Sequence, residues 1–396
     1  MAKRRNASRL VTNSALLLAV CFSTSQVFAE DCEVKIGAAG PMTGGASSWG
    51  LALKAGAEFQ AAQTNESGGL QVGNRKCRVK VLSYDAQCNA AGGAAASNYF
   101  AGEKVAAVMG PVCSPETTGF RPPASRNGQV DFSSSYMADV IAPQWPLVFH
   151  LQQGPAVWGP LLIREARDRF KIRSVVILGP NDQSGTDIGG QLARMYAAQG
   201  IKVTNEYYQR GTTNFGPVAI RIMSAAPDAV ELASTPTADV SLVVKQLTEA
   251  GFNGVYGALG GIGVTPVALG AGGVQKIKSY YWLELMPVDD PGARQLRADF
   301  SRVMKTAPPE NALFYTSSTA TEQLLHAISI AQTDSDAQKI AAALRKLTPE
   351  SHYFGRGGWR GKAQYGLNQE LAFPVGMGII ADSKLIGVKR VDIPSE

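Results

Sequence analysis

The sequence has few charged residues and few histidines. Only 18% of its 396 residues are Asp, Glu, Lys or Arg, and three are His. The formal net charge of +6 is concentrated near the start: Lys3, Arg4, Arg5 and Arg9 precede any acid, which leaves 34 of the 38 basic residues against 32 acidic ones. A balance of +2 over the remaining chain gives no basic surface for a phosphate backbone. The composition therefore argues against a nucleic-acid-binding protein.

Long hydrophobic runs are also missing. After residue 29, no stretch approaches the roughly 18 apolar residues that a membrane-spanning helix needs. The apolar segment at residues 14–22 is shorter, follows the basic residues, and precedes the small-x-small pattern Val27-Phe28-Ala29. This order is typical of a cleaved secretory signal peptide. We predict a signal peptide over residues 1–29 and a soluble mature chain exported to the periplasm.

Cysteine is scarce, and its spacing predicts no zinc site. Cys-x-x-Cys pairs are absent, and the histidines are far apart in the sequence. Removal of the signal peptide, which contains Cys21, leaves four cysteines: Cys32, Cys77, Cys88 and Cys113. An even number in an exported chain predicts two disulfides, with three possible pairings.

Motifs for catalysis and cofactor binding are lacking. There is no G-x-S-x-G nucleophile motif of a serine hydrolase. The glycine-rich segment at residues 37–45 does not have the G-x-G-x-x-G spacing of a dinucleotide site, and Pro41 interrupts it. The sequence therefore predicts a protein that is not an enzyme and that holds no cofactor.

Short β-rich apolar runs alternate with helical stretches through most of the mature chain, which is typical of α/β domains with mainly parallel sheets. The length is sufficient for two such domains. We predict strands at residues 34–39, 78–85, 105–110, 128–133, 174–179, 201–208 and 228–233. Helices are expected at 51–63, from 89, from 114, and at 157–170, 186–199, 215–225 and 238–250.

The last third of the chain departs from this alternation. Three helical stretches are predicted at residues 293–306, 313–331 and 337–347, followed by β-rich runs at 373–381 and 384–391. No Pro-, Gly- or Ser-rich linker separates two halves. This favours two domains joined by several short crossings over two independent units.

A series of short motifs, in order, resembles the branched-chain amino-acid binding proteins, the type I periplasmic solute-binding family of ABC transporters. The first strand and turn match the family pattern x-I-G-x-x-x-P-x-[TS]-G, with Trp49 at its aromatic position. Later matches are Asn65-Glu66-Ser67-Gly68-Gly69-Leu70, Tyr84-Asp85, Gly110-Pro111-Val112-Cys113-Ser114 and Leu247-Thr248-Glu249-Ala250-Gly251-Phe252. The resemblance covers essentially all of residues 30–390.

The resemblance implies a fold of two doubly wound parallel-sheet lobes joined by a three-crossing hinge. By alignment, residues 30–151 and 285–372 form lobe 1, and residues 152–284 and 373–396 form lobe 2. It further implies a monomer that closes on a small-molecule ligand between the lobes and then engages the permease subunits of an ABC transporter. The alternative is a periplasmic sensor that acts through a separate signalling partner.

The resemblance also nominates ligand-binding residues. In lobe 1, Ser114 at a helix start and Ser135 at the end of a strand offer donors for a carboxylate, and Trp49 would form a wall of the cleft. Four further positions differ from the family's amino-acid-binding pattern: Met137, Ser184, Thr235 and Leu259.

The departure at Leu259 bears on the ligand. Family members that hold an amino acid place a carboxylate there, which pairs with the ligand's ammonium group. An ammonium left unpaired in a closed cleft would cost several kcal/mol. We therefore expect a carboxylate-bearing aromatic or aliphatic acid rather than an amino acid.

The family's own disulfide resembles a Cys88–Cys113 pair, in which both residues follow neighbouring strands at the carboxyl edge of the sheet. Cys32 and Cys77 each precede one of the first two predicted strands. If those strands are adjacent and parallel, the two residues meet at the opposite edge. The predicted pairing is therefore Cys32–Cys77 and Cys88–Cys113.

Overall fold

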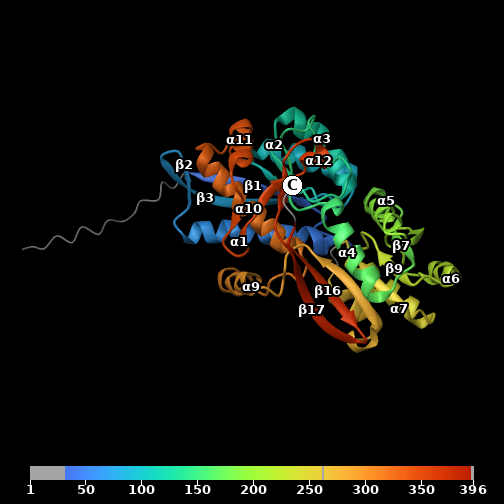
Figure 1. Ribbon diagram of the computed structural model, residues 1–396. Coiled ribbons are helices and arrows are strands. Elements are labelled where there is room, and N and C mark those ends of the chain that lie inside the picture. The colour runs from blue at the N-terminus through green and yellow to red at the C-terminus, as the bar shows by residue number, and fades with distance from the viewer. Residues whose placement is uncertain (1–31, 261–262, 394–396) are drawn as a thin grey trace, which may run out of the picture.

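The alternating strands and helices form two separate β-sheets with helices packed on their faces (Figure 1). The structure is a computed structural model, and it describes residues 32–260 and 263–393. The predicted signal peptide at residues 1–29 lies outside the described residues. In Figure 1, α5, α6 and α7 lie with the second sheet, away from α1, α2, α3, α10 and α11 around the first.

The first sheet has the strand order β14-β15-β6-β5-β4-β1-β3-β2. Its central pairings, from β3 through β1, β4, β5 and β6 to β15, are parallel, and the outermost strands on both sides are antiparallel. The strands are β1 (Glu33–Gly40), β2 (Leu70–Val72), β3 (Arg75–Asp85), β4 (Val108–Met109), β5 (Asp131–Ser133), β6 (Val148–His150), β14 (Gly358–Arg360) and β15 (Glu370–Ala372).

The second sheet has the order β17-β16-β11-β10-β9-β7-β8. The five strands from β11 to β8 are parallel, and β16 and β17 add an antiparallel hairpin at the other edge. The strands are β7 (Ser174–Pro180), β8 (Lys202–Tyr208), β9 (Ala229–Leu232), β10 (Val255–Ala258), β11 (Ser279–Glu284), β16 (Val375–Ala381) and β17 (Lys384–Val391). A small ribbon pairs β12 (Glu350–Ser351) with β13 (Gly355–Arg356).

Helices cover both sheets, and three of them begin with a polar capping side chain. The side chains of Asn89, Asp182 and Asp336 each accept a hydrogen bond from a free N–H of the helix that follows. The helices are α1 (Ser47–Glu66), α2 (Ala90–Glu103), α3 (Ser114–Asn127), α4 (Pro155–Phe170), α5 (Gln183–Ala198), α6 (Gly216–Ala225), α7 (Thr237–Glu249), α8 (Thr265–Ala271), α9 (Pro291–Met304), α10 (Leu313–Ala331), α11 (Ala337–Lys346) and α12 (Lys362–Tyr365).

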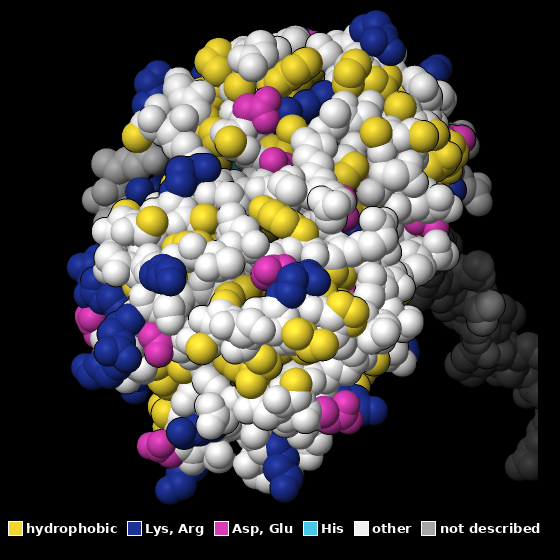
Figure 2. Space-filling model, turned by 90° about the vertical axis from the view of Figure 1, so that its right-hand side faces the viewer, with side chains coloured by type: hydrophobic (Ala, Val, Ile, Leu, Met, Phe, Trp, Pro, Cys, Tyr) yellow, Lys and Arg dark blue, Asp and Glu magenta, His cyan; other side chains and the backbone are white. Residues whose placement is uncertain are grey.

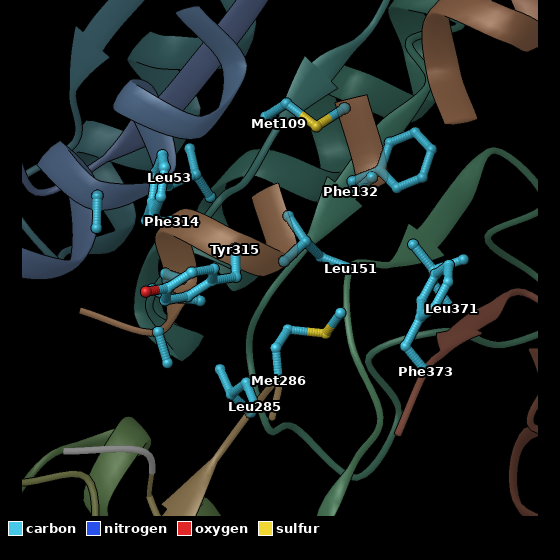
Figure 3. Close-up of a cluster of buried hydrophobic side chains, with 14 of the residues drawn as sticks. Leu53, Met109, Phe132, Leu151, Leu285, Met286, Phe314, Tyr315, Leu371 and Phe373 are labelled. Carbon is cyan, nitrogen blue, oxygen red and sulfur yellow. The ribbon is translucent and has the colours of Figure 1, made fainter. Parts of the chain in front are cut away.

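The chain passes between the two sheets three times: after β6, after β11, and between β15 and β16. Each crossing contributes to the same hydrophobic core. Leu151, Leu285 and Phe373, one from each crossing, are buried there (Figure 3). In addition, Gln153 donates a hydrogen bond to the carbonyl of Phe373 at 2.7 Å, which ties the first crossing to the third. The three connections are thus held together as one packed unit.

Both predicted disulfides are confirmed. β1 and β3 are adjacent and parallel, with Glu33 opposite Arg78, so the residues before these two positions meet at one edge of the sheet. Cys32 and Cys77 are bonded there, with 4.6 Å between their Cα atoms. Cys88 and Cys113 are bonded at the opposite edge, with a Cα separation of 5.3 Å. Both separations lie in the usual range for disulfides.

Candidate ligand-binding cleft

The strand order of each sheet points to one place where a ligand can bind. In the first sheet β1 lies between β3 and β4, and in the second sheet β7 lies between β8 and β9. The winding direction of the chain reverses at these points. Ligands bind to open α/β sheets beyond the carboxyl ends of the strands at such a reversal. The segments that follow β1, β4, β7 and β9 carry Trp49, Ser114, Ser184 and Ser234, and all four line one cavity.

This cavity lies between the two sheets and measures about 60 Å³. Hydroxyl, amide and indole groups line it, together with aliphatic side chains, and its described lining includes no charged side chain. The lining residues are Trp49, Val112, Cys113, Ser114, Ser134, Ser135, Tyr136, Gln152, Ser184, Ser234, Gly260, Leu285, Asn311 and Leu313. The cavity is therefore a neutral site whose wall combines hydrogen-bonding groups with apolar surface.

Ser114 is the first residue of α3, so its backbone N–H has no acceptor within the helix. That N–H donates to the hydroxyl of Ser184, across the cleft, at 3.2 Å. The hydroxyls of Ser114 and Ser135 are hydrogen-bonded at 3.0 Å, and the side chain of Asp187 also hydrogen-bonds Ser114. Burial raises the pKa of Asp187. The start of α3 thus places several hydrogen-bonding groups at one point of the cavity wall.

A buried carboxyl group holds the segment before Ser114 in place. Glu116 accepts hydrogen bonds from the backbone N–H groups of Cys88, Val112 and Cys113, at 2.7, 3.1 and 3.0 Å. The side chain is fully buried, and this burial raises the pKa of Glu116 to about 7. Together with the Cys88–Cys113 disulfide, Glu116 fixes the turn from which α3 begins.

Trp49 reaches the cavity from the first turn of α1. The neighbouring Gly50 lets the helix approach the preceding turn, because a Cβ atom at this position would collide with the carbonyl oxygen of Pro41. On its other side, the Trp49 ring has the guanidinium of Arg210, from the second sheet's side, 6.0 Å from its centroid. Arg210 is paired with Asp182. Trp49 is therefore held between the two halves of the molecule.

The structure brings together four of the seven predicted ligand-binding residues: Trp49, Ser114, Ser135 and Ser184. The other three do not line the cavity. Met137 is half-buried, with its sulfur 3.9 Å from the hydroxyl of Thr118. The hydroxyl of Thr235 is buried 3.5 Å from the carbonyls of Leu178 and Ala233.

Leu259 also lies outside the cavity, although its neighbour Gly260 is part of the lining. The Leu259 side chain is fully buried in the main hydrophobic core. Its backbone N–H donates to the buried carboxyl of Glu231 at 2.6 Å. The strand end at residue 258 therefore contributes backbone, and not the Leu259 side chain, to the cleft.

Sequence reasoning missed several lining residues, among them Gln152, Leu285 and Asn311. Gln152 and Leu285 come from the crossing segments, and Asn311 precedes α10. None of these positions lies in a motif or follows a predicted parallel strand. Only the three-dimensional path of the crossings reveals that they reach the site.

Metal binding finds no support in the described part of the chain. The grouped side chains of suitable type are Cys88, Cys113 and Glu116, and the two cysteines are already joined in a disulfide.

The described residues contain no helix long and apolar enough to cross a bilayer. On the face shown in Figure 2, Lys and Arg side chains occur across the surface and are most frequent along the left-hand edge, with Asp and Glu side chains among them.

Two sheets whose winding reversals face each other across a hydroxyl-lined cavity define a two-lobed ligand-binding protein. The sequence profile of the periplasmic binding proteins matches residues 33–373, and the chain belongs to that family. The architecture is that of the type I periplasmic binding proteins of ABC transporters.

Known proteins of this fold cover most of the chain. The leucine-, isoleucine-, valine-, threonine- and alanine-binding protein of Pseudomonas aeruginosa is 24% identical over 323 residues, which are 80% of this chain and 83% of that protein. The branched-chain amino-acid binding protein of Streptococcus pneumoniae, in complex with isoleucine, is 16% identical, with a TM-score of 0.75 over 91% of this chain and all of that one. A solute-binding protein of R. palustris, in complex with 4-hydroxybenzoate, is 17% identical, with a TM-score of 0.73 over 92% of this chain and 97% of that one.

Proposed function

We propose that this protein captures a small carboxylate-bearing ligand, an aromatic or aliphatic acid rather than an amino acid, for a branched-chain-amino-acid-type ABC transporter. The observation that carries the proposal is the neutral lining of the cavity. The hydroxyl groups and the backbone N–H of Ser114 at the start of α3 suit a carboxylate, because a helix N-terminus favours negative charge.

An amino acid also needs a partner for its ammonium group. No carboxylate side chain is among the described residues that line the cavity. Asp187 does not line the cavity: one of its oxygens hydrogen-bonds Ser114, and the other, Oδ2, is buried without a partner. Burial of an unpaired ammonium costs several kcal/mol, which would offset the gain from binding the carboxylate. An acid without an amino group avoids this cost.

The two neighbours described above show that one fold accommodates both classes of ligand, since one holds isoleucine and the other 4-hydroxybenzoate. The fold therefore does not decide between them. The lining of this chain's cavity, with Gly260 where a counter-charge could stand, favours the acid.

We further propose that residues 30–151 and 285–372 move as one lobe and residues 152–284 and 373–396 as the other. The strands of the first sheet fall within the first set, and those of the second sheet fall within the second. Ligand binding would shift the population toward the closed arrangement. The closed monomer then presents surfaces of both lobes to the permease subunits, and an ATPase elsewhere supplies the energy.

Export through a signal peptide at residues 1–29 fits this role. Two disulfides are present, and disulfides persist in an oxidising compartment such as the periplasm. Membership of the periplasmic binding protein family agrees with this location.

The test is a thermal-shift screen of the purified mature chain against aromatic acids, aliphatic acids, their methyl esters and the common amino acids. We expect stabilisation by at least one free acid, none by its ester, and none by the α-amino acid of similar shape. The Ser135→Ala variant should reduce the shift, whereas Ser224→Ala, at an exposed position of α6, should not. Stabilisation by amino acids alone would contradict the proposal.

A further inference from the structure

A groove adjoins the cavity and opens between the same two halves of the molecule. It measures about 780 Å³, more than ten times the 60 Å³ of the cavity. Asn311 lines both spaces. Residues of α1, α7, α8 and the segments around β11 and before α10 line the groove.

The two spaces share their walls along several segments of the chain. On α1, Trp49 lines the cavity, whereas Ser48 lines the groove. At the end of β11, Leu285 faces the cavity, and the preceding Glu284 lines the groove. Because consecutive residues divide between the two spaces and Asn311 lines both, the groove and the cavity adjoin each other.

The volumes of the cavity and the groove indicate where each part of a ligand can lie. The cavity, at about 60 Å³, is well below the roughly 300–1,000 Å³ that sites for whole small molecules typically measure, whereas the groove, at about 780 Å³, falls in that range. The groove is therefore the space that suits the body of an acid.

The chemistry of the groove suits an apolar body. Leu51 on α1 and Leu269 on α8 are 47% and 74% exposed, and both line it. Three prolines and Val264 add apolar surface. The carboxyl of Glu284, by contrast, is nearly buried and accepts a hydrogen bond from the indole N–H of Trp282 at 2.7 Å.

We propose that the ligand is an elongated acid, whose carboxylate lies in the cavity beside Ser114 while its aryl-alkyl or alkyl body extends past Asn311 into the groove. This inference rests on the proposed function, and it narrows the substrate class. Acids with a spacer between the carboxylate and the ring or chain end are then preferred to compact acids such as benzoate.

The test is calorimetry with benzoate, phenylacetate, 3-phenylpropanoate and 4-phenylbutanoate. We expect affinity to rise by up to about fourfold for each added methylene that enters the groove, which corresponds to about 0.8 kcal/mol per buried CH₂. Leu51→Asp places a charge on the groove wall at an exposed position. It should weaken the longest acid by about tenfold or more and benzoate by less than about twofold.

Ile330→Asp on α10 is the matched control, because Ile330 is 54% exposed and does not line the groove. It should change no affinity. Equal affinities along the series, or an equal loss at every length in Leu51→Asp, would overturn the groove assignment while the proposed function stands. Absence of binding by these four acids and by every aliphatic acid of the thermal-shift screen would instead overturn the proposed function.

Discussion

Buried carboxyl groups lie directly behind the walls of the cleft. Glu231 accepts hydrogen bonds from the backbone N–H of Leu259 at 2.6 Å and from the hydroxyl of Tyr196 at 2.8 Å. Tyr196 is in turn hydrogen-bonded to the hydroxyl of Tyr281. This network supports the strand end next to Gly260, on the second sheet's side of the cavity. Glu116 has the corresponding place beneath Ser114 on the first sheet's side.

These groups make stability depend on pH. Burial raises the pKa of Glu231 from 4.5 to about 7, so the folded protein holds this proton more tightly than the unfolded chain does. The resulting stability is fully present below pH 4.5 and is lost as the pH rises through 7. Between pH 8 and pH 5.5, we expect Glu231 to increase the free energy of unfolding by about 2 kcal/mol.

Melting temperatures at the two pH values test this expectation in the wild type and in Glu231→Gln, which cannot titrate. Glu116 and Glu284, whose pKa values burial also raises to about 7, add stability in the same direction and remain in the variant. The gain at pH 5.5 should therefore be smaller in Glu231→Gln, but not zero. An equal gain in both proteins would show that Glu231 does not titrate in this window.

Leu259 provides a second prediction for a single residue. Its side chain is fully buried in the main core, so Leu259→Ala should lower the free energy of unfolding by about 2–5 kcal/mol. The side chain does not line the cavity, so affinity for a bound acid should change by less than about threefold. Chemical denaturation and calorimetry measure the two effects. A large loss of affinity without a loss of stability would place this side chain in the cleft.

The sequence predicted part of the cavity lining. Trp49 and Ser114 follow strands β1 and β4 within recognisable motifs, and the strand-end rule applies to them directly. Leu259 also follows a strand, but the inward or outward direction of one side chain after a strand end depends on the backbone path. Asn311 carries no sequence signal at all, because its place is set by the packing of α10 against α1.

Among the secondary-structure elements, the long ones were predicted best, although the six-residue β11 (Ser279–Glu284) was also missed. The bounds of α10 and β17 were predicted without error, since each is long and regular in its pattern. β6 and β15 have three residues each, too few to show periodicity, and they were missed. Both strands lie at the crossings, whose number the family resemblance implied but whose structure the sequence did not reveal.

The Cys88–Cys113 disulfide fixes the start of α3, which carries the predicted ligand-binding residue Ser114. It closes a loop with a sequence separation of 25 residues, and its removal should cost about 3–4 kcal/mol by the chain-entropy estimate. Because Cys113 directly precedes α3, we also expect the Cys88→Ala/Cys113→Ala double variant to bind the acid at least about threefold more weakly. Denaturation and calorimetry measure both losses.

The other disulfide provides a matched control. Cys32–Cys77 closes a loop with a separation of 45 residues at the edge of the sheet away from the cavity. Its removal should cost about 4 kcal/mol and leave affinity unchanged. If both double variants lost affinity to the same degree, the effect would belong to general destabilisation rather than to the position of Ser114.

At the scale of the whole molecule, hydrogen bonds join the two sides of the cleft, so the two halves are in contact and the cleft is closed. Besides the Ser114–Ser184 contact, the hydroxyls of Ser48 and Thr237 lie 3.2 Å apart. The side chain of Gln191 donates to the carbonyl of Tyr136 at 2.5 Å. These bonds join the two halves at the rim of the cleft, away from the crossings, so opening of the molecule has to break them.

A disulfide across the rim should therefore lock the molecule. The hydroxyl oxygens of Ser48 and Thr237 lie 3.2 Å apart, so the side chains of the two positions meet, and we expect the Ser48→Cys/Thr237→Cys variant to form a disulfide when it is oxidised. We expect an acid bound before oxidation to remain through extensive dialysis, and an acid added after oxidation to bind at least about tenfold more slowly. Reduction of the new disulfide with a mild thiol should restore wild-type exchange. If the oxidised variant took up and released the acid at the wild-type rate, entry would not require the two lobes to separate.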